Sequence, residues 1–420
     1  MSKKSPFFLF LIFLSGLSYA QPEIPQLLYS DFFQIPSDTS STVFYTYKVP
    51  LNHLVFEKQA NLFLAEYRIS VEVFDSKNDK FITRAIKEKN IQVPDYEQTN
   101  SPLIFSEGIL ILYLKPGSYL MTEILYDYKS DREFKIPPYP VKIDSTIKYI
   151  TPLITTDKTV DCSKRKSAVL ANYGGKLPFD EELYSFIFPV KNPGTGTLFV
   201  NIIQDKDTLY HGRLTDPKKE KLTLSECGGK VALDENPDME EYNIFRIDGV
   251  SSRIREGGFL IYISDTSEFS TREKFTVACK WINKPVSLRD PELAIKVLKI
   301  IEKDSVINSL LNADDEDYIR ELAAYWKKID PTPETEFNPL MQEFYSRIDY
   351  AVKNFTTIAG ANGASTDRGK VYIRFGKPSD IDRTSDNYGN VIETWTYNNP
   401  QRKFVFVDKN GTGEFSLING

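Results

Sequence analysis

Six oxygen-bearing side chains near the C-terminus have the spacing of a calcium-binding loop. Positions one, three, five, seven, nine and twelve of such a loop are taken by Asp382, Thr384, Asp386, Tyr388, Asn390 and Glu393. Carboxylate, hydroxyl and amide oxygens suit a hard cation such as Ca²⁺. Asn387 stands where such loops have their turn glycine, however, and the flanking residues have the pattern of strands. An ordinary polar hairpin loop is the favoured interpretation, and a calcium site formed by Asp382, Asp386 and Glu393 is the alternative.

A pair of carboxylates near the same segment would suit hydrolysis of a glycosidic bond. Asp367 and Glu393 could supply the acid and the base or nucleophile of such a reaction. Carboxylate pairs are abundant, however, in a chain with 58 acidic residues. We therefore predict no catalytic residue, and we keep a hydrolase that uses these carboxylates as the alternative.

The three cysteines all fall in the middle of the chain, at Cys162, Cys227 and Cys279. In an oxidising compartment one pair can close a disulfide while the third thiol stays free, and the sequence does not choose among the three pairings. A cysteine nucleophile with His211 as its base is disfavoured, because His53 is the only other histidine. No paired cysteine or histidine spacing indicates zinc.

Aromatic and charged residues near the C-terminus form a candidate binding face. The candidates are Asp367, Arg368, Tyr372, Arg374 and Trp395, and aromatic and arginine side chains are typical anchors of protein interfaces. The favoured alternative is structural. In it, Thr366 or Asp367 caps a turn, Arg368 pairs with a carboxylate, and Gly369 permits an unusual backbone angle.

The elements that position these residues are predicted as a small sheet in residues 366–420. Val371, Ile373 and Phe375 alternate with polar residues, which indicates a strand ended by Gly376 and Pro378. Residues 392–397, 404–407 and 414–418 are the other predicted strands, with a hairpin turn at 408–413. The result is an antiparallel meander of about four strands.

Three helices are predicted just before this sheet, in about residues 290–355. Asp290 and Pro291 have the types of a helix cap and first helical residue, and an apolar stripe follows. The second helix, 315–329, has its stripe at Ile319, Leu322, Ala323 and Trp326. The third, 339–355, has its stripe at Leu340, Phe344, Ile348, Val352 and Phe355. Residues 285–420 therefore read as one α+β module.

Two all-β domains are predicted upstream, in residues 21–145 and 146–284. Regularly spaced strands and turns without helical periodicity indicate two tandem Ig-like β-sandwiches, each with a core of its own. In both, an arginine follows a turn glycine by the same interval, Arg132 after Gly117 and Arg272 after Gly257. Internal duplication and chance similarity both remain open.

Composition and the N-terminus bear on location. Lys3 and Lys4, the apolar run 7–14 and a small-residue site ending at Ala20 predict a secretory signal peptide, residues 1–20. The formal charge is −6, and removing Lys3 and Lys4 makes it 50 − 58 = −8, so no basic field attracts nucleic acid. No later stretch is long enough to cross a membrane. Gln21 in place of a cysteine disfavours a lipid anchor.

Four stretches of the C-terminal region together resemble the GWxTD-domain family of secreted bacterial proteins. They are residues 325–333, Asn338 with 343–351, 366–378 and 393–397. Residues 363–367 read Gly-Ala-Ser-Thr-Asp, so Ala364 stands where the family's name motif has tryptophan. The resemblance covers about residues 290–420 and implies an envelope or secreted location, but it implies no established reaction. We expect an extracytoplasmic, non-enzymatic binding or scaffold protein that recognises an envelope protein or surface component and needs no cofactor.

Overall fold

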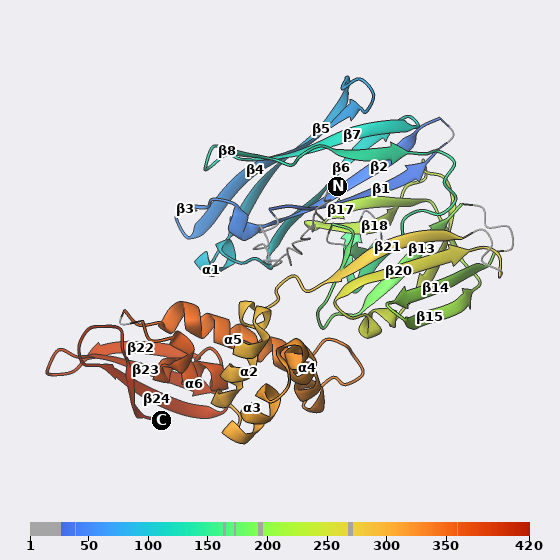
Figure 1. Ribbon diagram of the computed structural model, residues 1–420. Coiled ribbons are helices and arrows are strands. Elements are labelled where there is room, and N and C mark those ends of the chain that lie inside the picture. Colours follow the sequence, from blue (N-terminus) through green and yellow to red (C-terminus); the bar gives the residue numbers. More distant parts are fainter. Residues whose placement is uncertain are drawn as a thin grey trace, which may run out of the picture.

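The computed structural model describes residues 27–37, 39–162, 165–171, 174–191, 196–267, 272–358 and 360–420. The predicted signal peptide, residues 1–20, lies outside the described residues. Strands dominate up to residue 280, and helices and a last sheet follow (Figure 1).

The first β unit consists of two facing sheets. The three-stranded sheet has the order β1-β2-β6, with strands Tyr29–Pro36, Ser41–Pro50 and Phe105–Leu114. The six-stranded sheet is built on β4 and β7, which pair with all its other strands. Its strands are β3 (Glu57–Gln59), β4 (Leu62–Asp75), β5 (Phe81–Val93), β7 (Gly117–Asp127), β8 (Arg132–Lys135) and β9 (Tyr139–Ile143). A short helix, α1 (Tyr96–Thr99), follows β5.

The second β unit also pairs two sheets. The larger has the order β16-β19-β13-β10-β11-β18-β17, and the smaller β12-β21-β20-β14-β15. The larger sheet comprises Leu153–Cys162 (β10), Arg165–Leu170 (β11), Tyr184–Val190 (β13), Lys218–Glu220 (β16), Leu222–Cys227 (β17), Lys230–Glu235 (β18) and Tyr242–Ile247 (β19). The smaller comprises Lys176–Pro178 (β12), Leu198–Gln204 (β14), Asp207–Leu214 (β15), Gly257–Ser264 (β20) and Glu273–Lys280 (β21).

Each β unit has a core of its own, and a third buried cluster, the shared core, contains residues of both units and was not predicted. Strand β2 is buried on both faces: Tyr45 packs into the core of the first unit, while Phe44 packs with Leu153 and Tyr242 of the second. In Figure 1, β1 and β2 accordingly lie between the sheet of β4 and β7 and the hairpin of β17 and β18. The sequence signal was limited to the three consecutive apolar residues Val43, Phe44 and Tyr45, because a strand covered on both faces carries apolar side chains on both.

Five helices follow the β units, where three were predicted. They are α2 (Pro291–Val297), α3 (Asp304–Leu311), α4 (Tyr318–Lys328), α5 (Pro339–Phe355) and α6 (Asp367–Phe375). Asp290 caps α2 as expected, since its carboxylate accepts a hydrogen bond from the Leu293 amide at 3.0 Å. The prediction missed α3.

The last sheet has four antiparallel strands in the order β22-β23-β24-β25. They span Asp380–Ser385, Val391–Asn398, Gln401–Asp408 and Ser416–Asn419. The strand predicted at 371–375 is wrong, because these residues lie in α6. The Thr366 hydroxyl caps this helix and Gly376, at φ 76°, ends it.

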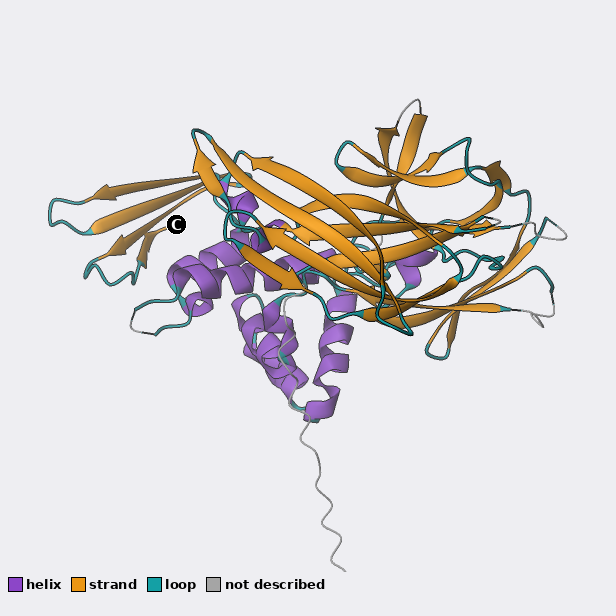
Figure 2. Ribbon diagram, turned by 90° about the horizontal axis from the view of Figure 1, so that it is seen from above, coloured by secondary structure: helices purple, strands orange, loops and turns teal. Residues whose placement is uncertain are grey.

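Helices α5 and α6 cover the inner face of this sheet. Phe355 of α5 packs on Trp395 with ring centroids 5.5 Å apart, and Phe375 of α6 packs on Phe404 at 5.1 Å. Figure 2 shows the helices as a group beside the sheet that ends at the C-terminus. All buried members of this core lie between Ala294 and Phe406, so residues 286–420 carry a complete core of their own.

Candidate functional site

The C-terminal region meets the second β unit through three aromatic rings. Trp281 follows β21 and lies 5.5 Å from Phe179 and 5.7 Å from Phe337, between ring centroids. Its indole N–H donates to the Gln342 side chain of α5 at 2.6 Å. Trp281 and Phe337 are each 6% exposed, so this contact is a buried joint.

An apolar groove opens beside this joint. We call it the junction groove; its volume is about 260 Å³. Its walls come from the segment after β21 and from α2, α4 and α5, and its apolar lining includes Trp281, Leu288, Pro291, Ile319, Leu322, Ala323, Trp326 and Met341.

Helix α4 supplies one wall through the stripe predicted from the sequence. Leu322 and Trp326 are buried at 6% and 2% exposure, but Ile319 is 68% exposed and Ala323 is also exposed. The stripe therefore packs into the core only through Leu322 and Trp326. Ile319 and Ala323 leave apolar surface at the mouth of the groove.

Charged and polar side chains surround the groove. Lys284, Lys327, Asp330 and Glu336 line it. Lys284 pairs with Glu256 at 2.7 Å, and Asn338 fixes the floor by donating to the Trp326 carbonyl at 2.9 Å. An apolar centre with a rim of both charges is the usual composition of a protein-binding surface. The prediction missed Trp281 as a site residue, because it lies 45 residues before Trp326 in the sequence.

Residues 363–367 form a tight joint between α5 and α6. A Cβ atom on Gly363 would lie 2.0 Å from the Ala351 carbonyl oxygen, so only glycine allows this approach. The Thr366 hydroxyl donates to the Gly363 carbonyl at 2.8 Å and accepts from the Gly369 amide at 3.1 Å. Ala364 is buried in the core at 4% exposure. Gly363 and Thr366 therefore have structural roles.

Asp367 and Arg368 also serve the fold. The Asp367 carboxylate accepts from the Leu417 amide at 3.0 Å and so ties the start of α6 to β25. Arg368 is 8% exposed, lies over the Phe415 ring at 4.0 Å, and its guanidinium approaches the Glu393 carboxylate at 3.6 Å. Burial lowers the pKa of Arg368, while Glu393 acts against that shift.

Of the other members of the predicted binding face, Trp395 and Tyr372 are internal, whereas Arg374 is exposed. Trp395 is 1% exposed, and its indole N–H donates to Glu393 at 2.6 Å. Tyr372 is 9% exposed and stacks on Tyr350 at 4.3 Å. Arg374 donates to the Ile300 carbonyl at 2.9 Å. The five residues do not form one exposed face, and the contacts of Thr366 and Arg368 match the structural alternative.

The structure does not bring the predicted calcium ligands together. Glu393 pairs with Arg383 across β22 and β23 and points inward, whereas Asp382 is opposite Thr394 and points to the other face. Asp386 accepts from the amides of Tyr388 and Asn390 in the hairpin turn. The remaining residues of the pattern are Thr384 in β22 and the turn residues Tyr388 and Asn390. This geometry matches the polar hairpin loop.

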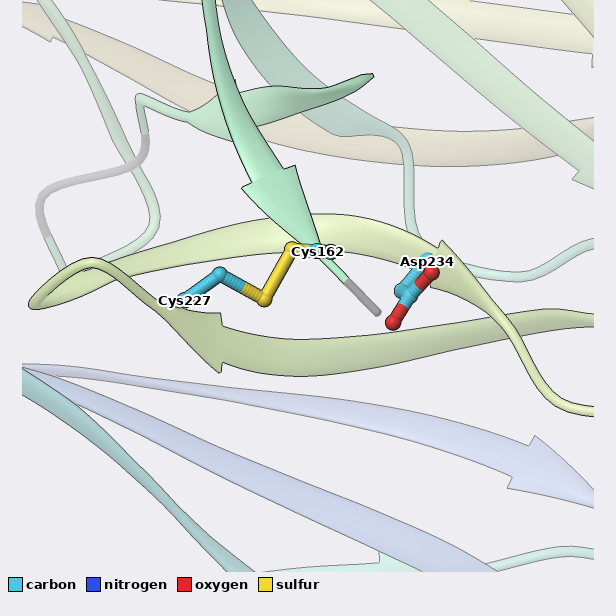
Figure 3. Close-up of side chains that lie close together, drawn as sticks. All are labelled: Cys162, Cys227 and Asp234. Atoms are coloured by element: carbon cyan, nitrogen blue, oxygen red, sulfur yellow. A yellow bond between two sulfur atoms is a disulfide. The ribbon is translucent and has the colours of Figure 1, made fainter. Parts of the chain in front are cut away.

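Cys162 and Cys227 are joined by a disulfide, with their Cα atoms 5.4 Å apart, and Cys279 is a buried free thiol. Asp234 lies beside the disulfide (Figure 3). These three residues are grouped as metal ligands could be, but the disulfide leaves no thiolate to bind a cation. Two strands, β20 and β14, separate Cys279 in β21 from His211 in β15, so the structure does not bring this cysteine and histidine together.

None of the described helices combines the length and apolar character that a membrane span requires. A search of curated proteins finds no match to this chain. A family model described as the GWxTD domain matches residues 260–418, which begin inside β20 and include β21, all five C-terminal helices and the last sheet up to Ile418. This chain therefore contains a GWxTD domain at residues 260–418.

Proposed function

We propose that this protein is an extracytoplasmic, non-enzymatic binding or scaffold protein of the bacterial envelope, and that the junction groove receives apolar side chains of a partner protein. The observation that carries the proposal is the open side of α4: Ile319 and Ala323 leave apolar surface next to Trp281 and Trp326. A contiguous apolar surface with a polar rim is typical of an interaction site.

The size of the groove favours side chains over a free small molecule. Its volume of about 260 Å³ is below the roughly 300–1,000 Å³ of pockets for drug-sized ligands. The rim carries Lys284 and Lys327 as well as Asp330 and Glu336, which suits the polar backbone and flanking residues of a partner segment.

The contacts of the acidic residues near the last sheet support binding over hydrolysis. Glu393 is held by Arg383 and Trp395, and Asp367 by Leu417. Asp408 accepts hydrogen bonds from the amides of the turn at 410–413. A glycosidase needs two carboxylates that face its substrate; here Glu393 is buried, and Asp367 and Asp408 are engaged by backbone amides.

Two observations support an extracytoplasmic location. The N-terminal twenty residues have the pattern of a secretory signal, and the Cys162–Cys227 disulfide suits an oxidising compartment. The proposed extracytoplasmic location rests on these two features.

Capture from an envelope extract with matched variants tests this function. Ala323→Trp should fill the groove and Ile319→Glu should place a charge at its mouth. Ile358→Glu changes an apolar residue of 88% exposure elsewhere in the domain and serves as the control. We expect the wild-type protein and the Ile358→Glu variant to capture the same partner. Both groove variants should fail to capture it. Equal retention by all four proteins, or no specific partner together with turnover of an envelope polymer, would reverse the proposal.

A further inference from the structure

A second cavity, distinct from the junction groove, lies where the two β units meet. Its volume is about 590 Å³, and Lys48 and Glu107 of the first unit and Lys230, Asp180 and Tyr184 of the second line it. The volume is within the roughly 300–1,000 Å³ range of small-molecule sites, which often lie at domain interfaces. We call it the interunit cavity.

An irregularity in strand β10 accompanies this cavity. The pairing of β10 with β11 shifts register between Thr155 and Thr159, and Thr156 and Thr159 line the cavity. Such bulges are common next to functional sites, because they interrupt pairing and redirect side chains.

One end of the interunit cavity is rich in cations. The Lys230 ammonium lies 2.6 Å from one Glu107 oxygen, and the Lys48 ammonium lies 3.5 Å from the other. Two ammonium groups thus share one carboxylate, whose side chain is only 3% exposed. The Glu107 oxygen that faces Lys48 is buried, so the accessible polar groups at this end are the two ammonium groups, Lys230 more than Lys48.

The lining also includes an acidic group, Asp180. Its carboxylate accepts from the Tyr184 hydroxyl at 2.8 Å and from the Glu182 amide at 3.0 Å. Within the described residues it has no ion-pair partner. Burial raises the pKa of Asp180, while the hydrogen bonds from Tyr184 and Glu182 act against that shift.

We propose that the interunit cavity binds a short peptide with free amino and carboxyl ends. The peptide carboxylate lies beside Lys230 and Lys48, and its ammonium group lies beside Asp180. Apolar residues of the lining, among them Val169, Leu170 and Pro178, accommodate small side chains. Both charges of the ligand are thereby paired, which a partly buried site requires.

Calorimetric titration of the full chain with the dipeptide Ala-Ala tests the proposal. The comparison ligands are N-acetyl-Ala-Ala, which lacks the ammonium group, and Ala-Ala amide, which lacks the carboxylate. We expect saturable one-to-one binding of Ala-Ala and about tenfold weaker binding of each blocked form, since hydrogen bonds to charged groups contribute about 1.5–3 kcal/mol.

Two variants assign each end of the ligand to its partner. Lys230→Met should abolish the preference for Ala-Ala over its amide, and Asp180→Asn should abolish the preference for Ala-Ala over its N-acetyl form. Asp238→Asn, at an exposed residue away from the lining, is the control and should keep both preferences. Thermal unfolding of each variant checks that it folds.

Absence of saturable binding by the folded wild type would overturn the proposal, and the cavity would then hold only water. The proposal would also be overturned if both blocked dipeptides bound as tightly as Ala-Ala. It would likewise be overturned if the Lys230→Met and Asp180→Asn variants kept the preferences of the wild type. These readouts do not depend on partner capture at the junction groove, so the two proposals fail separately.

Discussion

The carboxylate of Glu393 lies 3.6 Å from the guanidinium of Arg368 inside the C-terminal domain, where their side chains are 2% and 10% exposed. Trp395 and Arg383 donate to the same carboxylate. A group that sequence patterns suggest as a calcium ligand or catalytic acid is therefore the centre of a buried network. Removing one partner of such a network leaves the other charge without compensation.

We predict that Glu393→Gln lowers the free energy of unfolding of the C-terminal domain by about 3 kcal/mol, because Arg368 keeps its buried charge. All three tryptophans, Trp281, Trp326 and Trp395, lie in this domain or at its joint, so tryptophan fluorescence in urea measures its stability. Asp382→Asn, at an exposed neighbour, is the control and should change stability by less than about 0.5 kcal/mol. Equal midpoints for the two variants would contradict the role of Glu393.

The joint at Gly363 gives a second prediction. Gly363→Ala should destabilise the domain by about 3 kcal/mol, the upper end of the usual cost of overpacking, because the new methyl group would lie 2.0 Å from the Ala351 carbonyl oxygen. Gly258→Ala is the matched control, since nothing lies within 4 Å of a Cβ atom there. Urea unfolding of the two variants measures the difference in their free energies of unfolding. A Gly363→Ala protein as stable as wild type would show that α5 and α6 can separate without cost.

The shared core predicts that one substitution weakens both β units together. Phe44 is 1% exposed and lies between them, so Phe44→Ala should cost about 3–5 kcal/mol. Circular dichroism should show one cooperative transition of the β units at a lower temperature. Phe81→Ala, at 51% exposure, should leave that transition unchanged within about 0.5 kcal/mol. Two separate transitions in the Phe44 variant would instead show that each unit folds on its own.

Burial raises the pKa of the Cys279 thiol to about 12, against an ordinary value of about 8.5. Only the thiolate reacts with disulfide reagents, and at pH 8 this thiol stays protonated. Thiol counting should therefore find none in the native protein, one after denaturation and three after denaturation with reduction. One rapidly reacting thiol in the native protein would contradict the burial of Cys279. Three thiols in the denatured, unreduced protein would contradict the Cys162–Cys227 disulfide. A Cys279→Ser variant should show none until it is reduced.

The sequence was informative where local chemistry decides the structure. Asp290 and Pro291 start α2 as predicted, and the third predicted helix coincides with α5. The segment 371–375 was misread because its apolar residues alternate, while the helix they form is too short to display its period. Thr366 and Gly376 carried the correct signal as helix cap and stop. The junction groove and the interunit cavity could not be predicted, because each combines residues distant in sequence.

The core of the C-terminal domain yields the last prediction, on what this domain needs in order to fold. A fragment of residues 286–420 keeps all buried members of its core, from Ala294 to Phe406, and should unfold cooperatively. A fragment of residues 360–420 loses Phe344, Tyr345, Ile348 and Phe355 of α5. Each such side chain contributes about 1.5–3 kcal/mol when buried, so their joint loss is comparable to the roughly 5–15 kcal/mol that stabilises a whole domain.

The shorter fragment should therefore show narrow amide chemical-shift dispersion and no cooperative melt, because the inner face of its four strands has lost the α5 cover. The longer fragment, measured at the same concentration, is its control. Adding a separate peptide of residues 335–358 to the shorter fragment should restore dispersion in part, since it returns Phe355 to Trp395. Dispersed resonances and a cooperative melt for residues 360–420 alone would show that the sheet and α6 form a core without α5.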